Sequence, residues 1–309
     1  MSSLPILCLM GPTASGKTAL AIEIATKFHC DIISVDSALV YKGMDIGTAK
    51  PDLAIRQLIP HALIDILEPS EAYSAGRFLD DVEKLIAASH AKCRIPLLVG
   101  GTMLYFNTLR NGLATLPPAS ISIRSEIEAR AAQSSWQILH QELQNLDPQS
   151  AAKIKPNDKQ RIQRALEVLY SSGKTLTEWQ AKQYHPFATA NLIWLCLYPD
   201  KREELHQRIA IRLESIMQQG FVEEVKELRA RGDLHMDLPS QRAVGYRQAW
   251  EYLDGKSTHA EFVEKTLIAT RQLAKRQLTW LKAWDMHCQA DFSQPQQIVS
   301  YLEKEVFSK

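Results

Sequence analysis

The stretch GPTASGKT, residues 11–18, is the feature that most restricts how this 309-residue chain can fold. It follows the apolar run LPILCLM and precedes ALAIEIATKF, in which apolar residues recur at helical spacing. A Gly-x-x-x-x-Gly-Lys-Thr loop between a strand and a helix holds phosphates with backbone N–H groups and the positive end of the helix. We therefore expect Lys17 to reach an outer phosphate and the Thr18 hydroxyl to bind Mg²⁺. The loop alone does not distinguish a nucleoside triphosphate from another diphosphate.

Strands and helices alternate through the first hundred residues. Apolar and β-branched runs predict strands at residues 5–10, 30–36, 61–67 and 95–101. Helical spacing predicts helices from the loop to about Phe28 and from Ser74 to about Ala91. This alternation is typical of a parallel sheet flanked by helices, so the predicted class is α/β with a P-loop-type core.

The pattern changes at LPP, residues 116–118, after which only helical periodicity is found from about Ser120 to Lys182. The apolar run at residues 191–199 then predicts a strand that returns to the sheet. The predicted organisation is a P-loop α/β core made of residues 1–116 and 190–309, with an all-helical insertion domain at residues 117–189. Long helices are expected as far as Trp284, and a peripheral tail from about Ala290.

Composition narrows the class of protein. The formal net charge is +1, so no global field attracts a polyanion and a nucleic acid must be held by local basic patches. The five cysteines are scattered without zinc-ligand spacing, which indicates neither a disulfide framework nor a zinc site. No segment approaches the roughly 20 apolar residues of a membrane span, and no signal peptide is visible. We expect a cytoplasmic protein without a membrane partner.

Two polar residues follow predicted strands. Asp36 ends the second strand, where ligands of open α/β sheets bind, and is a candidate general base or hydrogen-bond acceptor. The alternative role for Asp36 is a helix N-cap. Thr102 follows two glycines at the end of the fourth strand and could bond a leaving oxygen. The alternative there is a plain strand-to-helix turn.

Basic residues gather in several segments. Arg208 and Arg212 lie one helical turn apart and could both face a phosphate, although, taken alone, a solvated helix face explains the pair better. Further basic patches occupy residues 159–164, 242–248 and 270–284. The last patch combines a basic edge with an apolar stripe, which suits contact with a phosphate backbone or, alternatively, a salt-bridged surface helix.

The residues leave three classes of protein open. A protein that binds RNA or DNA as well as a phosphorylated ligand explains both the loop and the basic patches. An ATP-dependent small-molecule kinase explains the loop and Asp36, but not the patches. A nucleic-acid-binding ATPase would often carry an acid at the end of the fourth strand, where this chain has Gly-Gly-Thr.

Taken in combination, the motifs resemble those of bacterial tRNA dimethylallyltransferases, also called tRNA isopentenyltransferases. The resemblance extends to about Trp284 and rests on GPTASGKT, ISVDSALVYKGMDIGTAKP, LLVGGTMLY, NDKQRIQRALEV, LHQRIAIR, GDLHMDLPSQRAVGYRQ and TRQLAKRQLTWLK. It implies that the loop holds dimethylallyl diphosphate, with Mg²⁺. It also implies transfer of the dimethylallyl group to N6 of the adenosine 3′ to the anticodon, in tRNAs reading codons that start with U. A monomer is the family expectation.

The resemblance also assigns roles to residues of this chain. Asp36, Thr102, Arg212 and Lys17 are expected to be catalytic. The diphosphate is expected to contact Gly11, Thr13, Ala14, Ser15, Gly16, Lys17, Thr18, Arg208 and Arg212. The residues expected to contact tRNA are Asp36, Ser37, Ala38, Leu39, Thr102, Arg124, Gln160, Arg161, Ile162, Gln163, Arg164, Arg242, Ala243, Val244, Gly245, Tyr246, Arg247, Lys275, Arg276, Gln277, Leu278, Thr279, Trp280, Leu281 and Lys282. Some relatives have Gln where this chain has Leu39.

Overall fold

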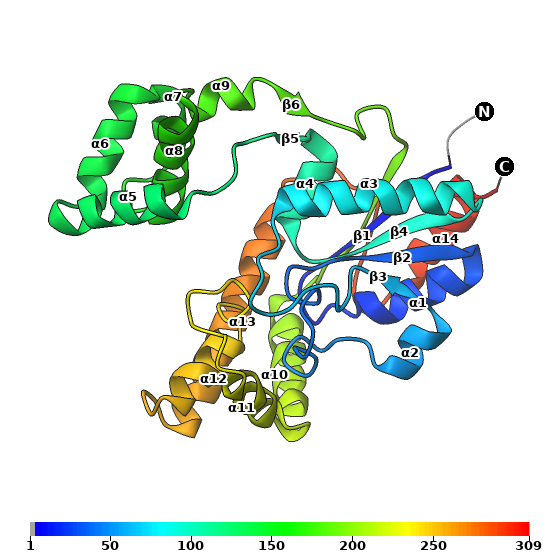
Figure 1. The fold of residues 1–309 in the computed structure, drawn as a ribbon. Helices are drawn as coiled ribbons and strands as arrows, with labels where there is room; N and C mark the ends of the chain where they lie inside the picture. Colours follow the sequence, from blue (N-terminus) through cyan, green and yellow to red (C-terminus); the bar gives the residue numbers. More distant parts are fainter. Residues whose placement is uncertain (1–3, 309) are drawn as a thin grey trace. The chain divides into compact units, whose positions relative to one another are not determined.

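A six-stranded sheet, in which every neighbouring pair of strands is parallel, forms the centre of the computed structural model, which describes residues 4–308. In spatial order its strands are β3 (His61–Ala62), β2 (Cys30–Val35), β4 (Ile95–Gly100), β1 (Ile6–Met10), β7 (Leu192–Leu197) and β8 (Cys288–Ala290) (Figure 1). The predicted α/β class is confirmed. The strand predicted at residues 191–199 is β7, which pairs with β1.

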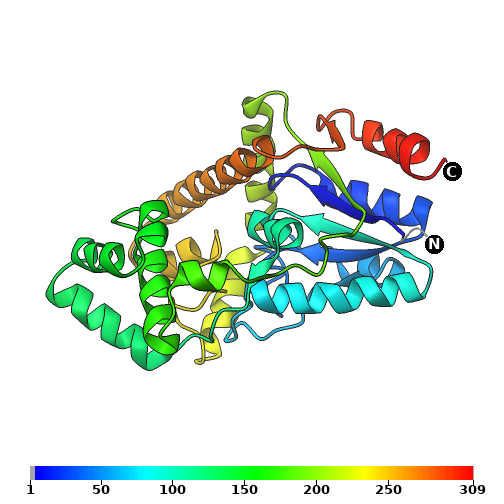
Figure 2. The same cartoon turned by 90° about the horizontal axis from the view of Figure 1, so that it is seen from above.

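Helices α1 (Lys17–Phe28) and α3 (Ala75–Ala91) lie on opposite faces of the sheet (Figure 2). Right-handed crossovers that run in opposite directions from β1 and β3 require this arrangement. Because both faces are covered, the five residues of β1 are at most 2% exposed. Both helices match the sequence prediction, and the Ser74 side chain caps α3 by accepting the Arg77 N–H. The shorter helices of this part are α2 (Leu53–Leu58) and α4 (Met103–Asn111).

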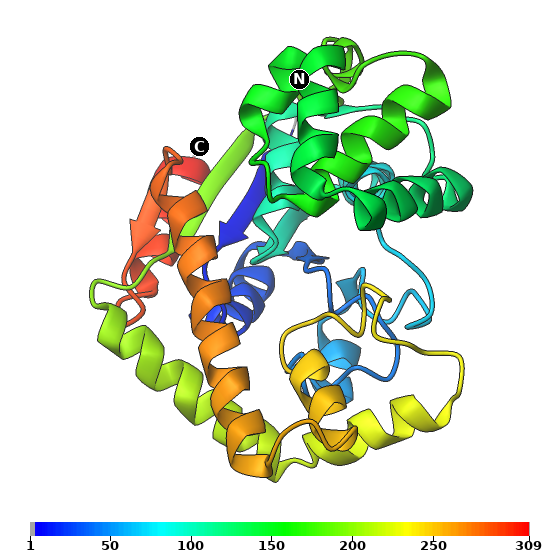
Figure 3. The same ribbon diagram turned by 90° about the vertical axis from the view of Figure 1, so that its left-hand side faces the viewer.

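Four helices form a cluster beside the sheet, seen in Figure 3 with α13 in orange and α10 in yellow-green. They are α10 (Arg202–Gln218), α11 (Phe221–Ala230), α12 (Tyr246–Leu253) and α13 (His259–Lys282). Helix α13 begins with a capping box formed by Thr258 and Glu261. Their side chains accept two backbone N–H groups that have no hydrogen-bond partner within the helix. Of the apolar stripe that the helical spacing predicts, Ala274, Leu278 and Leu281 are buried, and Leu267 is partly exposed.

The chain divides into two compact units, of which the second comprises Thr108–Ala188. Its helices are α5 (Ile121–Gln133), α6 (Trp136–Leu146), α7 (Pro148–Lys153), α8 (Lys159–Ser172) and α9 (Leu176–Gln180). They enclose a core in which Ile127, Leu143 and Ile162 are fully buried. An antiparallel pair, β5 (Leu113–Ala114) and β6 (Gln183–Tyr184), joins the ends of this unit and was not predicted. Within residues 4–308, no helix combines the length and the apolar character that crossing a bilayer demands.

Two predictions about the sheet are wrong. The third strand was expected at residues 61–67, but β3 has only two residues, because Leu63 and Asp65 adopt positive φ angles of 62° and 55° that end the extended chain. The tail expected from Ala290 is not peripheral. Strand β8 pairs with β7, and α14 (Gln296–Tyr301) continues into a π-helical turn, η1 (Leu302–Val306).

The C-terminal segment should therefore contribute to stability. Leu302 is 0% exposed, so Leu302→Ala should lower the free energy of unfolding by about 2–4 kcal/mol, the usual cost of such a cavity. The exposed neighbour Lys304 gives the matched control, and Lys304→Ala should change stability by less than about 0.5 kcal/mol. Denaturant unfolding measures both variants. If the two variants were equally stable, the C-terminal segment would be a peripheral tail, as the sequence predicted.

Candidate active site

The phosphate loop connects β1 to α1 and bends through two left-handed residues, Ala14 at φ 61° and Gly16 at φ 88°. Such alternation turns successive backbone N–H groups toward one concave side, where an anion can bind. Among the described residues, no side chain caps the N-terminus of α1, so its first N–H groups remain available to a ligand. The Lys17 Nζ donates to the Pro12 carbonyl at 2.6 Å and lies 3.3 Å from the Ser15 hydroxyl.

Arg212 of α10 lies close enough to Lys17 for the two charges to affect each other. Burial and the positive charge of Arg212 lower the pKa of Lys17 to about 8, while the carboxylate of Asp36 opposes this shift. Burial also lowers the pKa of Arg212, and Asp36 again opposes the shift. Two partly desolvated cations are stable together only if negative charge compensates them. The arrangement is that of an anion site.

Arg208 lies one turn before Arg212 but has other partners. Its guanidinium forms an ion pair with Glu204 at 2.9 Å and stacks over the ring of Phe292 at 5.1 Å. Together with Gly16 and Arg212 it lines a smaller cavity of about 410 Å³ beside the phosphate loop. The ion pair occupies Nε and Nη2 of Arg208, whereas Nη1 lies 3.9 Å from the Cβ position of Gly16 in the phosphate loop.

Asp36 and Thr102 meet because β2 and β4 are neighbours and end at the same edge of the sheet. The Asp36 Oδ1 accepts N–H groups from Ala38 at 2.8 Å and from Leu39 at 3.3 Å. No hydrogen bond to Oδ2 forms among the described residues, so this oxygen can serve a substrate. The expected alternative, a helix N-cap, does not apply, since α2 begins only at residue 53.

Thr102 fixes the spacing between the two strand ends. Its Oγ1 accepts the backbone N–H of Ser37 at 3.0 Å and donates toward the Ser37 hydroxyl at 3.4 Å. The residue also directly precedes α4, so the strand-to-helix turn and the contact with the Asp36 loop coexist. The bond to the Ser37 hydroxyl is long, so rotation of the Thr102 O–H could direct it to a substrate oxygen.

Gln277 of α13 contacts both loops although it lies far away in sequence. Its Oε1 accepts the Thr13 N–H at 2.9 Å, and its Nε2 donates to the Gly101 carbonyl at 2.9 Å. The Thr13 N–H is therefore occupied, whereas the Thr13 hydroxyl is available to bind a phosphate. Gln277 is only 8% exposed, so its side chain braces the loops and does not belong to the outer surface of α13.

These groups line a cavity of about 620 Å³ within the first unit. Its polar lining includes Lys17, Thr18, Asp36, Thr102, Arg212 and Arg242. Its apolar lining includes Ala21, Ile32, Ile64, Met103, Ile209, Leu213, Ile216, Phe221, Leu273 and Trp280. A cavity with cations in one part and aliphatic and aromatic walls elsewhere suits a ligand with an anionic end and an apolar end.

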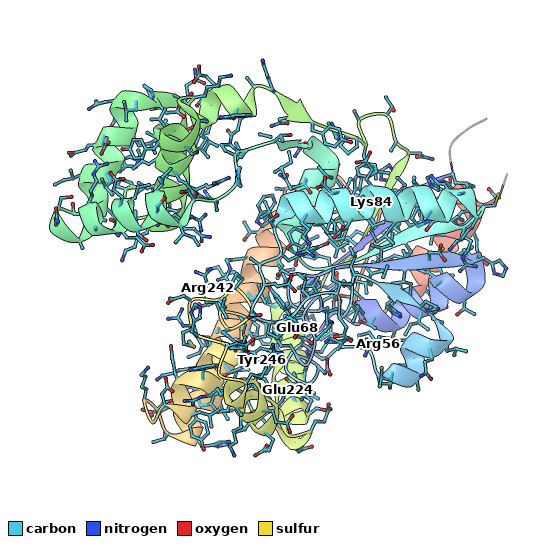
Figure 4. All side chains as sticks on the ribbon, viewed as in Figure 1. Arg56, Glu68, Lys84, Glu224, Arg242 and Tyr246 are labelled. Atoms are coloured by element: carbon cyan, nitrogen blue, oxygen red, sulfur yellow. The ribbon has the colours of Figure 1, made fainter. Side chains whose placement is uncertain are left out.

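A buried carboxylate that the sequence reasoning missed holds the next part of the wall. Glu224 of α11 accepts the N–H groups of Asp45 at 2.8 Å and Ile46 at 2.7 Å, and the hydroxyl of Tyr246 at 2.6 Å; Figure 4 shows the two side chains together. The same loop continues to Thr48, whose carbonyl accepts the Arg212 Nη2 at 2.9 Å. Glu224 thereby fixes the loop that orients Arg212.

A signal for Glu224 was present in the sequence. It lies three residues after Phe221 and four before Leu228, on the buried face of α11 where an apolar residue is expected. An acid on an apolar face needs a partner, but the sequence does not identify that partner.

The residues expected to contact tRNA separate by burial. On α13, Lys275, Arg276, Thr279, Trp280 and Lys282 are exposed, whereas Gln277, Leu278 and Leu281 are buried. Before and at the start of α12, Arg242 and Arg247 are exposed, Ala243 and Val244 are partly exposed, and Gly245 and Tyr246 are buried. The buried side chains can support an RNA surface but do not form it.

In the second unit, a fully buried carboxylate engages two of the expected RNA contacts. Glu167 accepts hydrogen bonds from Arg124 at 2.9 Å and from Arg164 at 2.7 Å. Burial alone would raise the pKa of Glu167, but these two arginines lower it below its ordinary value. Ile162 is buried in the core, whereas Gln160 and Arg161 are exposed. Gln163 donates to Glu128 at 2.8 Å.

Thr18 is the residue that suits a metal at this site. Its side chain is exposed, it lines the cavity, and it follows Lys17 at the start of α1. Among residues 4–308, no group of three His, Cys, Asp or Glu side chains could hold a metal ion. A hydroxyl with substrate phosphates and water is a donor set that Mg²⁺ accepts. The residues present therefore fit a cation that arrives with its ligand.

The fold and the cavity define an α/β protein with a phosphate-type loop at the first βα turn of a parallel sheet, beside a cavity with both cationic and apolar walls. The model of the family described as IPP transferase matches residues 39–284. The chain therefore belongs to the IPP transferase family. This confirms the resemblance to tRNA dimethylallyltransferases and does not favour the kinase alternative.

Solved structures support the same assignment. The chain is 33% identical to the full-length tRNA isopentenylpyrophosphate transferase from Bacillus halodurans, with a TM-score of 0.71 over 98% of this chain and 97% of that one. It is 32% identical to the tRNA Δ(2)-isopentenylpyrophosphate transferase from Staphylococcus epidermidis, with a TM-score of 0.68 over 99% and 100%. A eukaryotic dimethylallyltransferase acting on tRNA is 27% identical, with a TM-score of 0.79 over 99% and 77%.

Removing the Glu224 carboxylate should leave buried N–H donors without partners. Glu224→Ala should lower the free energy of unfolding by about 3 kcal/mol or more. Glu223→Ala on the same helix removes only an exposed pair with Lys226 and should cost less than about 0.5 kcal/mol. Chemical denaturation measures both. If the two variants are equally stable, Glu224 does not hold the loop.

Anion binding at the phosphate loop should weaken in mild alkali. Lys17 is largely protonated at pH 7 and largely neutral at pH 9, because its pKa is lowered to about 8. Affinity for inorganic diphosphate should therefore fall about tenfold between these pH values. In Lys17→Arg the side chain stays charged over this pH range. Calorimetry should therefore show that its diphosphate affinity depends less on pH, and ionisation of the ligand itself contributes equally to both proteins. Parallel profiles would contradict the assignment.

Proposed function

We propose that the protein transfers the dimethylallyl group of dimethylallyl diphosphate to N6 of the adenosine on the 3′ side of the anticodon, in tRNAs reading codons that start with U. The observation that carries this proposal is the cavity in which the cations Lys17 and Arg212 lie near Asp36, beside an apolar wall. The diphosphate matches the cations and the five-carbon group matches the wall. Family membership supports the same reaction.

In the proposed step, the adenine N6 lone pair forms a bond to C1 of the donor while the C1–O bond breaks. The diphosphate leaves with the electron pair of that bond, and Lys17, Arg212 and the loop N–H groups stabilise its growing charge. Thr102 donates a hydrogen bond to the bridging oxygen. Asp36 orients the amine through Oδ2 and finally accepts its proton, since an exocyclic adenine amine is a poor nucleophile.

Mg²⁺ is part of the proposal and would be held by the Thr18 hydroxyl together with the ligand. When bound, it would supply additional neutralisation of the diphosphate charge. The loop residues Gly11, Thr13, Ala14, Ser15 and Gly16 would shape the cradle, with Arg208 as a further clamp.

The exposed basic residues are proposed to bind tRNA. On the first unit these are Arg242, Arg247, Lys275, Arg276 and Lys282. The insertion, residues 117–189, is proposed to contribute Gln160 and Arg161, with Arg124 and Arg164 supporting them through Glu167. The target base has to leave its stack to reach the cavity. Trp280, which lines the cavity and is 39% exposed, offers an aromatic face near it. A cytoplasmic monomer is the expected form.

The function is tested with an anticodon stem-loop that has three adenines spanning the target position. The RNA is incubated with the protein, Mg²⁺ and dimethylallyl diphosphate and is then weighed by mass spectrometry, with an ATP-only reaction beside it. A gain of one five-carbon prenyl unit is expected. No gain, together with consumption of ATP, would contradict the proposal and favour the kinase alternative.

Asp36→Ala should lower the single-turnover rate of transfer by about 100-fold or more, the scale of a positioned acid–base group. Affinity for the stem-loop should change much less, because the phosphate backbone dominates that affinity. Asp80→Ala, on the exposed face of α3, is the control with the same charge change. A rate in Asp36→Ala close to that of the control would exclude this role for Asp36.

A further inference from the structure

Gln277 uses both ends of its amide to join two loops that carry different parts of the proposed site. The Thr13 N–H belongs to the phosphate loop after β1, and the Gly101 carbonyl belongs to the turn after β4. These two strands are neighbours, with Met10 paired to Gly100 at their ends. The glutamine therefore spans the gap between the two loops at the point where the strands stop.

The chemistry of the two partners requires an amide. Thr13 presents a donor and Gly101 presents an acceptor, so the bridging side chain must accept at one atom and donate at the other. A carboxylate would accept from Thr13 but could not donate to Gly101, and a thioether would do neither well. Gln277 is 8% exposed, so a substitution that removes either bond leaves a largely buried backbone group without its protein partner.

Gly101 is fitted to the glutamine. A Cβ at this position would lie 2.4 Å from Gln277 Nε2 and 3.3 Å from the Gly11 carbonyl. Its φ is not positive, so the glycine is needed for the close approach and not for a left-handed backbone. Two residues separated by 176 positions in the chain are thus mutually adapted.

We propose that Gln277 is a positioning residue that sets the spacing between the phosphate loop and Thr102, an inference that rests on the proposed function. The brace continues beyond Gly101, because the adjacent Thr102 accepts the N–H of Ser37, next to Asp36. A single amide thus holds the donor loop in register with the groups assigned to the leaving oxygen and the nucleophile. Loss of this amide slows the chemical step, because small misplacements of the reacting groups lower the reaction rate strongly.

The helix that carries the brace also carries an exposed basic surface. Lys275 and Arg276 precede Gln277 and are exposed, while the glutamine points to the opposite, buried side. The brace and the RNA surface can therefore be separated experimentally. A variant of Gln277 should leave RNA affinity intact, whereas a general collapse of α13 should reduce it.

The first test compares Gln277→Met and Gln277→Glu with Gln272→Met, a control at an exposed position of the same helix. Both Gln277 variants should lower the single-turnover rate about tenfold or more and raise the KM for dimethylallyl diphosphate. Stem-loop affinity should remain within about twofold of wild type. Rates equal to that of the control, or a loss of RNA affinity as large as the loss of rate, would overturn the proposal.

The second test is a double-mutant cycle that combines substitutions of Gly101 and Gln277 and measures whether their effects on the transfer rate are additive. Gly101→Ala should slow transfer about tenfold, because its methyl group displaces the amide. In the Gln277→Ala background the same change should cost less than about threefold, since the group it displaces is gone. Fully additive effects would show that Gly101 and Gln277 act independently and would overturn the brace.

The two proposals can fail separately. If wild-type protein adds no prenyl group to the stem-loop, the proposed function fails. Binding of inorganic diphosphate, which needs no reaction, still tests the brace: Gln277→Met should weaken it about fivefold or more, the lower part of the range for coupled sites. Unchanged diphosphate affinity in that variant would contradict the brace whatever the reaction is.

Discussion

The mutual effect of Lys17, Arg212 and Asp36 is the interaction on which the site depends. Burial lowers the pKa of both cations, the charge of Arg212 lowers that of Lys17 further, and the Asp36 carboxylate opposes both shifts. An anion that binds between the cations recovers the free energy that their desolvation costs. Much of the surrounding structure holds these charges in place: the sheet aligns the strand ends, Glu224 fixes the loop that meets Arg212, and Gln277 joins the phosphate loop to the neighbouring turn.

The holding groups share a physical character. Glu224 and Gln277 are polar, buried and hydrogen-bonded to backbone groups of loops that belong to other elements. Loops cannot be fixed by their own periodic hydrogen bonds, so a rigid helix supplies the missing partners. The helical cluster therefore does more than cover the sheet. Its helices α11 and α13 each send one polar side chain inward to a loop that lines the cavity.

Local patterns made the centre of the fold predictable. The apolar run of β1, the glycine spacing of the loop and the helical spacing of α1 lie within thirty residues, and Asp36 follows directly from the end of β2. Strand β8 could not be predicted, because a strand of three residues is too short to show a pattern and is defined only by its pairing with β7. The burial of the polar Gln277 on α13 was equally hidden: Lys275 and Gln277 occupy one basic segment, yet only Lys275 faces solvent. Tertiary contacts, and not composition, separate the two.

The most direct measurement is a crystal structure with an unreactive thiolo analogue of dimethylallyl diphosphate and an anticodon stem-loop. The account predicts that the diphosphate lies between Lys17 and Arg212, with the target adenine N6 within hydrogen-bond reach of Asp36 Oδ2 and facing C1 of the analogue. It also predicts that Gln277 keeps both of its bonds. An analogue bound away from the phosphate loop, or an adenine directed elsewhere, would contradict the account.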